Sequence, residues 1–168
     1  YYLAFQTQPI PRNRICQLFW PNTDDEKGRK LLREALSKLR AALPDPSVLL
    51  TVSGEVFLDP QQVYLDAREF KEITDPLLES AEINRDAILP AWMYSEMRRA
   101  ISLCRGSIKL ESMNGEMPAG YSDYLTLASQ YYDSTRLRII ERLASHCIAT
   151  GDLDEAIVWL NKALEIDP

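Results

Sequence analysis

Cationic side chains gather on one face of a helix-forming stretch, RKLLREALSKLRAAL, at residues 29–43. Leu and Ala recur in it at helical spacing, which predicts an amphipathic helix with one apolar face. Guanidinium and ammonium groups can pair with phosphates or with guanine edges, and a serine hydroxyl can hydrogen-bond to either. The alternative is an ordinary solvated face, since surface helices commonly carry charge outward. The candidate nucleic-acid contacts on this helix are Arg29, Lys30, Arg33, Ser37, Lys38 and Arg40.

A further candidate contact, Arg14, lies near the start of a shorter helix predicted over residues 12–20, RNRICQLFW. At that place it could reach a phosphate together with backbone N–H groups. Residues 1–8 are expected to be the end of an earlier helix, because prolines follow directly. The residues of the 12–20 helix expected to point inward are Ile15, Leu18 and Phe19.

The segment after the basic helix predicts a β-hairpin. VLLTV and VFL flank the turn SGE within residues 48–58, and β-branched runs on either side of a glycine turn are typical of hairpins. Before the basic helix, NTDDE at residues 22–26 supplies helix caps and early acids. Short helix, basic helix and hairpin wing follow the order of a helix-turn-helix, whose second helix enters the major groove. The wing tip carries no basic residue.

The second half of the chain predicts helices alone. Asp66 and Glu69 have capping-box spacing for a helix that ends near residue 83. Further helices are expected over about 90–105, 122–150 and 152–166, with NGEMPAG as a loop and Gly106 as a helix stop. The residues with helical spacing in the helix over 90–105 are Met93, Met97, Ala100, Ile101 and Cys104.

The final segment, GDLDEAIVWLNKALEIDP, matches the second half of a tetratricopeptide repeat. Gly151 falls at the turn, and Ala156 and Ala163 fall where the two helices pack closely. One such repeat cannot bury its own faces, so the upstream helices must complete its core. A scaffold helix pair and a peptide-binding groove are both compatible with the pattern. The packing positions of the preceding helix are Ile140, Leu143, Ala144 and Cys147.

Charge is distributed unevenly along this acidic chain of net charge −6. Residues 1–58 hold eight Lys and Arg against six Asp and Glu, whereas residues 59–168 hold eleven against nineteen. Because net charge bears on association rather than on fold, this asymmetry favours two parts with different partners. The boundary is placed between a domain over 1–65 and a domain over 66–168.

Little in the sequence indicates catalysis, a metal site or a cofactor. The three cysteines have no CxxC spacing, and a packed Cys147 beside a hydrogen-bonded His146 is expected. NGEMPAG has no phosphate-binding pattern, so we do not expect an enzyme. No apolar stretch approaches the roughly 20 residues that cross a bilayer, and a cytoplasmic protein is expected.

The order of these segments resembles bacterial transcriptional activators of the antibiotic-regulatory-protein (SARP) type. Residues 12–70, from RNRICQLFWP to VYLDAREF, are similar to their winged-helix segment. RRAISLCRGSIKL, YSDYL and the terminal repeat are similar to the bacterial transcriptional activator domain that follows it. The family's winged helix begins with a small β-sheet and a complete first helix, and the sequence contains no such sheet and only the last turns of that helix.

The resemblance implies a mainly α protein, with a partial winged helix-turn-helix followed by a tetratricopeptide-like domain. Promoter DNA would bind the third helix, which by position implies the six residues from Arg29 to Arg40 named above. The helical domain would contact RNA polymerase subunits or form a homo-oligomer. The alternative is a protein-interaction module of a larger signalling protein, with a degenerate winged helix.

Overall fold

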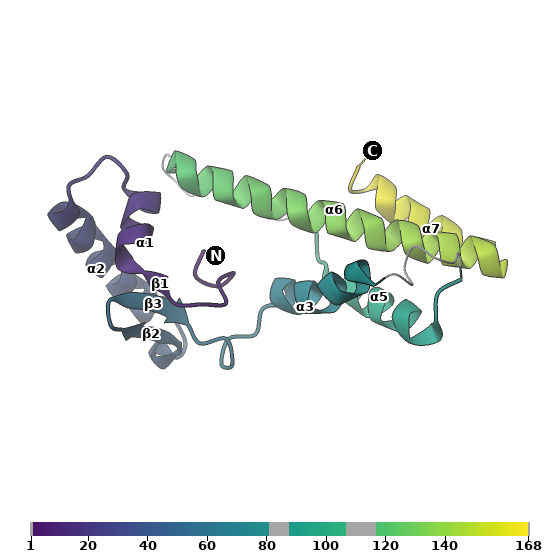
Figure 1. Ribbon diagram of the computed structural model, residues 1–168, viewed down its shortest axis with the longest axis horizontal. Coiled ribbons are helices and arrows are strands. Elements are labelled where there is room, and N and C mark those ends of the chain that lie inside the picture. The colour runs from purple at the N-terminus through teal and green to yellow at the C-terminus, as the bar shows by residue number, and fades with distance from the viewer. Residues whose placement is uncertain (1, 81–87, 107–116, 168) are drawn as a thin grey trace. The chain divides into compact units, whose positions relative to one another are not determined.

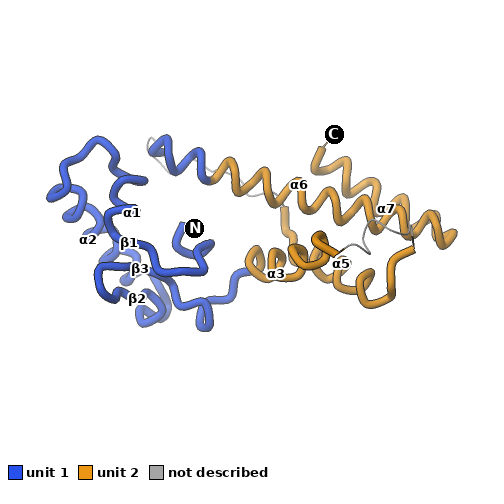
Figure 2. Tube along the Cα trace, in the orientation of Figure 1, with its two compact units in different colours: residues 1–65, 111–124 blue, residues 66–110, 125–168 orange. Residues whose placement is uncertain are grey.

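The computed structural model describes residues 2–80, 88–106 and 117–167 (Figure 1). Figure 2 shows two compact units: unit 1 comprises residues 1–65 and 111–124, and unit 2 comprises residues 66–110 and 125–168. The described elements are mainly helices, with one small antiparallel sheet in unit 1, in agreement with the mainly α class. The predicted NGEMPAG loop is confirmed only at Met117 and Pro118, because residues 114–116 lie outside the described residues and Ala119 already begins a helix. The helix predicted to end near residue 83 ends at Glu79.

Unit 1 combines a three-stranded sheet with two helices and the first residues of a third. The predicted helix end over residues 1–8 is wrong, because the described residues from Tyr2 to Phe5 form a turn. Its elements are β1 (Ile10–Pro11), α1 (Arg12–Phe19), α2 (Asp25–Ala42), a 3-10 turn η1 (Pro46–Val48), β2 (Leu49–Val52), β3 (Glu55–Leu58) and residues 119–124 of α6 (Ala119–Thr150).

The sheet confirms the predicted hairpin and adds a strand that was not predicted. Its order is β1-β3-β2, with Thr51 of β2 opposite Val56 of β3. The turn residues Ser53 and Gly54 both have positive φ, 51° and 85°, as a two-residue type I′ hairpin requires. Strand β1 contains only two residues, and Pro11 is tolerated there because an edge strand need not donate every N–H.

Helix α2 starts earlier than its apolar pattern suggests. It begins at Asp25, because the Asp24 carboxylate accepts a hydrogen bond from the Lys27 N–H at 2.7 Å and caps the first turn. Its buried positions are Gly28, Leu32 and Leu36. A Cβ on Gly28 would lie 3.3 Å from the Thr23 hydroxyl and 3.6 Å from the Cys16 Cβ, so glycine permits the close packing of α1 on α2.

The predicted inward faces of these two helices are confirmed in part. Leu31, Leu39 and Leu43 are half-buried, but Ala35 and Ala42 are exposed, contrary to the prediction. On α1, Ile15 is buried, whereas Leu18 and Phe19 are half-buried. Phe19 lies against aromatic rings, with centroid distances of 5.9 Å to Tyr2 and 4.8 Å to Tyr121.

Replacing Asp24 with alanine should lower the free energy of unfolding by about 1 kcal/mol, because the first turn of α2 loses its cap. Urea unfolding followed by circular dichroism measures this loss. Asp25→Ala is the matched control: its side chain is 96% exposed in an ion pair of 3.7 Å, so its expected cost is below about 0.5 kcal/mol. Equal costs for the two variants would contradict the cap assignment.

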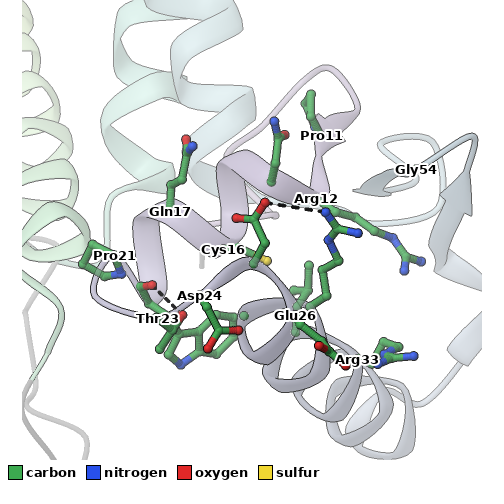
Figure 3. A pocket seen from close by; sticks show the side chains of 16 residues that line it. Pro11, Arg12, Cys16, Gln17, Pro21, Thr23, Asp24, Glu26, Arg33 and Gly54 are labelled. Atoms are coloured by element: carbon green, nitrogen blue, oxygen red, sulfur yellow. Dashed lines mark hydrogen bonds and ion pairs between the residues drawn. The ribbon is translucent and has the colours of Figure 1, made fainter.

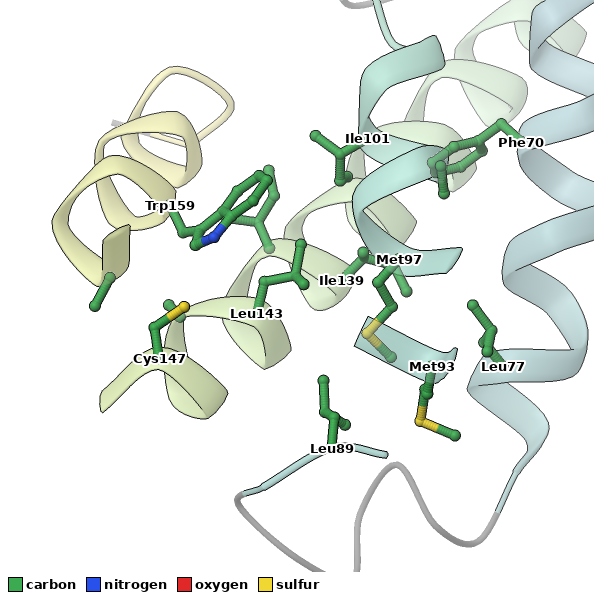
Figure 4. Packing of buried hydrophobic residues seen from close by; sticks show 14 residues of the cluster. Phe70, Leu77, Leu89, Met93, Met97, Ile101, Ile139, Leu143, Cys147 and Trp159 are labelled. Atoms are coloured by element: carbon green, nitrogen blue, oxygen red, sulfur yellow. The ribbon is translucent and has the colours of Figure 1, made fainter. Parts of the chain in front are cut away.

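Unit 2 is built from helices α3 (Asp66–Glu79), α5 (Ala91–Leu103), the part of α6 from Leu125 to Thr150, and α7 (Leu153–Leu164). Figure 4 shows their shared core, where Phe70 and Leu77 of α3 meet Met93 and Met97 of α5 and Ile139 of α6. The prediction for α5 is confirmed at its four positions from Met93 to Ile101, whereas Cys104 is half-buried at the end of the helix.

Helices α6 and α7 form the predicted helix pair. Gly151 has φ of 83° between them, a conformation that favours glycine at a helix end. The Asp152 carboxylate then accepts the Glu155 N–H at 3.2 Å and starts α7. Ala156 and Trp159 are buried, and Ala163 is half-buried. The buried residues of α6 include the four predicted ones, Ile140, Leu143, Ala144 and Cys147.

Candidate nucleic-acid interface

Five of the six predicted contact residues of α2 share one face, and Lys38 lies farther round the helix. Successive helical residues are rotated by about 100°, so Arg29, Arg33 and Arg40 lie along one edge of the buried face. Lys30 and Ser37 point most directly outward, and Lys38 lies on the opposite edge. Arg29, Lys30, Arg33, Ser37 and Lys38 are exposed, as predicted.

A groove of about 1020 Å³ lies along the arginine edge (Figure 3). Its walls are α1, the first half of α2 and the hairpin turn at Gly54. Both Arg29 and Arg33 line it. The hairpin turn is held against α1, because the Gly54 carbonyl accepts a hydrogen bond from the Arg12 N–H at 3.1 Å. The structure therefore brings two predicted cations together on a concave surface.

Arg12 is a third arginine of this groove and was not among the predicted contacts. It is half-buried, and its Nε has no hydrogen-bond partner among the described residues. The only sequence signal was its position as the first residue of α1 after Pro11. Its place at the groove follows from the pairing of β1 with β3, which local sequence does not reveal.

An acidic rim also borders the groove, formed by Asp24, Asp25 and Glu26. The Arg29 Nη2 lies 3.7 Å from the Asp25 Oδ2, with the two side chains 71% and 96% exposed. An ion pair so exposed contributes little stability, so Arg29 can exchange its carboxylate partner for another anion. The rim lowers the positive potential at the beginning of α2, which limits unspecific attraction of polyanions.

Arg40 differs from the prediction that it faces solvent. It is half-buried, and its Nη2 donates to the Thr51 hydroxyl at 3.2 Å and toward the Leu49 carbonyl at 3.5 Å. Both acceptors belong to β2. The Arg40 guanidinium thus joins α2 to the hairpin, and part of its hydrogen-bonding capacity is taken up by these contacts within unit 1.

Arg14 lies apart from the groove. It lines a smaller hollow of about 360 Å³ together with Tyr2, Gln6, Gln17 and Tyr124, among others. Gln6 donates to the Tyr124 hydroxyl at 3.1 Å, which closes one side of this hollow. The structure therefore separates Arg14 from Arg29 and Arg33, the predicted contacts that line the larger groove.

The cysteines and the histidine form structural contacts. Burial raises the pKa of the Cys16 thiol, with a smaller opposing effect of Arg29, so this thiol stays protonated at neutral pH. As predicted, Cys147 is buried and His146 is hydrogen-bonded: its Nδ1 accepts the Leu89 N–H at 3.0 Å. Burial and the contact with Cys147 raise the pKa of Tyr94 to about 12. Among the described residues, no cluster of His, Cys, Asp and Glu could hold a metal ion.

A polar cluster in unit 2 is centred on Asp75. Lys71 donates to its carboxylate at 2.5 Å, and the Tyr131 hydroxyl donates to the same group. Burial would raise the pKa of Asp75, but these two hydrogen bonds outweigh that effect and hold it below its usual value. The hydrogen bond to Asp75 raises the pKa of Lys71. Both groups thus stay charged at neutral pH. Their ion pair lies within α3, and the Tyr131 hydroxyl, which accepts from Lys71 at 3.2 Å and donates to Asp75, links α3 to α6.

Comparison of the chain with protein-family models and with curated proteins gave no match. In the described part of the chain, every helix is too short or too polar to cross a membrane.

Proposed function

We propose that unit 1 binds duplex DNA and that the chain acts as a cytoplasmic transcriptional regulator. The observation that carries this proposal is the groove where Arg12, Arg29 and Arg33 converge between two helices and a hairpin turn. Exposed arginines on a concave surface suit the phosphates and base edges of nucleic acid.

The element order supports the same function. Strand, helix, helix and hairpin follow one another from β1 to β3, and residues 20–24 connect the two helices. In helix-turn-helix proteins the second helix lies in the major groove and the first crosses the backbone. On that basis α2 is the recognition helix and the hairpin is the wing, in line with the resemblance to SARP-type activators.

Unit 2 is proposed to make the protein contacts, through a tetratricopeptide-like pair formed by α6 and α7. Four large apolar residues, each between 45% and 60% exposed, lie on one face of α7: Leu153, Ile157, Leu160 and Leu164. An exposed apolar face of this kind marks a protein-interaction surface. RNA polymerase subunits or a second protomer are the proposed partners. The same face, with the acidic rim of unit 1, favours the second candidate function, an interaction module whose winged helix does not bind DNA.

A salt-titrated binding assay tests the DNA proposal. Fluorescence anisotropy of the full chain with a labelled duplex should show affinity that falls steeply with salt. The logarithm of the binding constant falls by about 0.9 per neutralised phosphate for each unit of the logarithm of the salt concentration. Five exposed cations on α2, from Lys27 to Lys38, give an expected slope of about −4.5 when each neutralises one phosphate. The absence of salt-dependent binding would overturn DNA binding and favour the interaction module.

Replacing Arg40 with methionine should weaken DNA binding severalfold without changing the salt slope. The variant keeps the apolar stem but loses the hydrogen bonds that join α2 to β2, worth about 1 kcal/mol of stability. Lys38→Met is the control, since it removes an exposed charge and should reduce the slope by about 0.9. Equal reductions of the slope would show instead that Arg40 contacts phosphate.

A further inference from the structure

We infer that the groove of unit 1 recognises guanine, so that α2 selects G·C-rich duplex DNA. This inference rests on the proposed function and adds the class of DNA sequence. Its basis is the set of side chains that α2 presents to the groove and to solvent.

The exposed side chains of α2 match one kind of base pair. Arginine and lysine bind the O6 and N7 of guanine, and aspartate and glutamate accept from the N4 amine of cytosine. Adenine is instead read by asparagine or glutamine, and neither occurs anywhere in Asp25–Ala42. The exposed charged residues of α2 are Asp25, Glu26, Lys27, Arg29, Lys30, Arg33, Glu34 and Lys38.

The two groove arginines of α2 have a spacing that suits two bases about two steps apart on one strand. Arg29 and Arg33 are one helical turn apart, which is about 6 Å along the axis. Bases of one strand are stacked about 3.4 Å apart, so the planar, fork-shaped guanidinium groups of the two arginines can reach guanines about two steps apart. Asp25 lies 3.7 Å from Arg29 and places an acceptor beside the first fork. A donor fork and an acceptor side by side complement a guanine next to a cytosine amine.

Asn13 and Gln17 of α1 also line the groove and carry amides that could read adenine. The Asn13 Oδ1 already accepts the Arg14 N–H at 2.8 Å. Moreover, the first helix of a helix-turn-helix crosses the backbone rather than entering the groove. Their amides are therefore assigned to phosphates.

Three duplexes of equal length and phosphate number test the inference with the full chain, by fluorescence anisotropy over a range of salt concentrations, with affinities compared at the same salt concentration. One is G·C-rich, one is A·T-rich, and one is the G·C-rich duplex with 7-deazaguanine, which keeps pairing and phosphates but lacks N7. We expect the G·C-rich duplex to bind at least about tenfold more tightly than the A·T-rich one, since one bidentate pair gives about 1–3 kcal/mol of discrimination. The deaza duplex should lose most of this preference.

Arg33→Lys provides the matched variant, because it keeps the charge and removes the planar fork. Its salt slope should equal that of the parent chain, while its preference for the G·C-rich duplex falls severalfold. Circular dichroism checks that the variant is folded. Equal affinity for the three duplexes, or preference for the A·T-rich one, would overturn the inference while leaving DNA binding intact. The absence of salt-dependent binding to all three would overturn the proposed function and the inference together.

Discussion

The double variant Arg29→Ala/Arg33→Ala is expected to bind duplex DNA about 100-fold more weakly than the parent chain. The two residues share one groove, and a good contact of an arginine with a base or phosphate contributes about 1–3 kcal/mol. A loss of 100-fold corresponds to about 2.8 kcal/mol, within the sum of two such contacts. Removing Arg29 also leaves Asp25 without its partner, which adds repulsion toward phosphate. Anisotropy titrations at several salt concentrations measure the loss.

The matched control is Lys27→Ala/Lys38→Ala, which removes the same charge from the opposite edge of α2. Both residues are exposed, so neither double variant should unfold. The salt slope should fall by about 1.8 for the lysine pair when both lysines neutralise phosphates, and by less for the arginine pair, which is assigned to guanine edges. The affinity loss should be larger for the arginine pair, because only that pair lines the groove. Equal affinity losses would mean that α2 attracts DNA through net charge alone.

Local signals predicted the helices and the hairpin because each arises from neighbouring residues. The apolar spacing of α2, the acids at its start and the glycine turn of the hairpin act within a few positions along the chain. In the same way, Gly151 and the small residues around it predicted the pair α6 and α7. Strand β1 was not predicted, because two residues, one of them a proline, are too few to show the alternating apolar pattern of a strand.

The candidate site was less predictable, because its geometry depends on long-range pairing. Arg33 and Arg40 are seven residues apart and lie along the same edge of α2, so helical projection alone treats them alike. The register of β2 distinguishes them, since Thr51 lies within reach of Arg40. Arg12 and Arg14 lie two residues apart in the same helix, and the sequence gives no reason to distinguish them. The structure nevertheless places Arg12 at the groove and Arg14 at the smaller hollow.

Phe70→Ala should lower the free energy of unfolding by about 3–5 kcal/mol. The Phe70 ring is 1% exposed and lies 5.9 Å from the Tyr132 ring, within the core shown in Figure 4. Helix α3 depends on this packing, because Pro76 removes one of its internal hydrogen bonds. Natural domains have about 5–15 kcal/mol in total, so the loss approaches the stability of a small domain.

Urea unfolding followed by far-ultraviolet circular dichroism and by tryptophan fluorescence, to which the buried Trp159 of unit 2 contributes, measures this loss. Phe70→Leu should cost less than about 1.5 kcal/mol, because it keeps most of the apolar volume. Leu127→Ala removes a side chain that is 66% exposed on α6 and should change stability by no more than about 0.5 kcal/mol. A cost below about 1 kcal/mol for Phe70→Ala would show that α3 does not hold the core of unit 2 together.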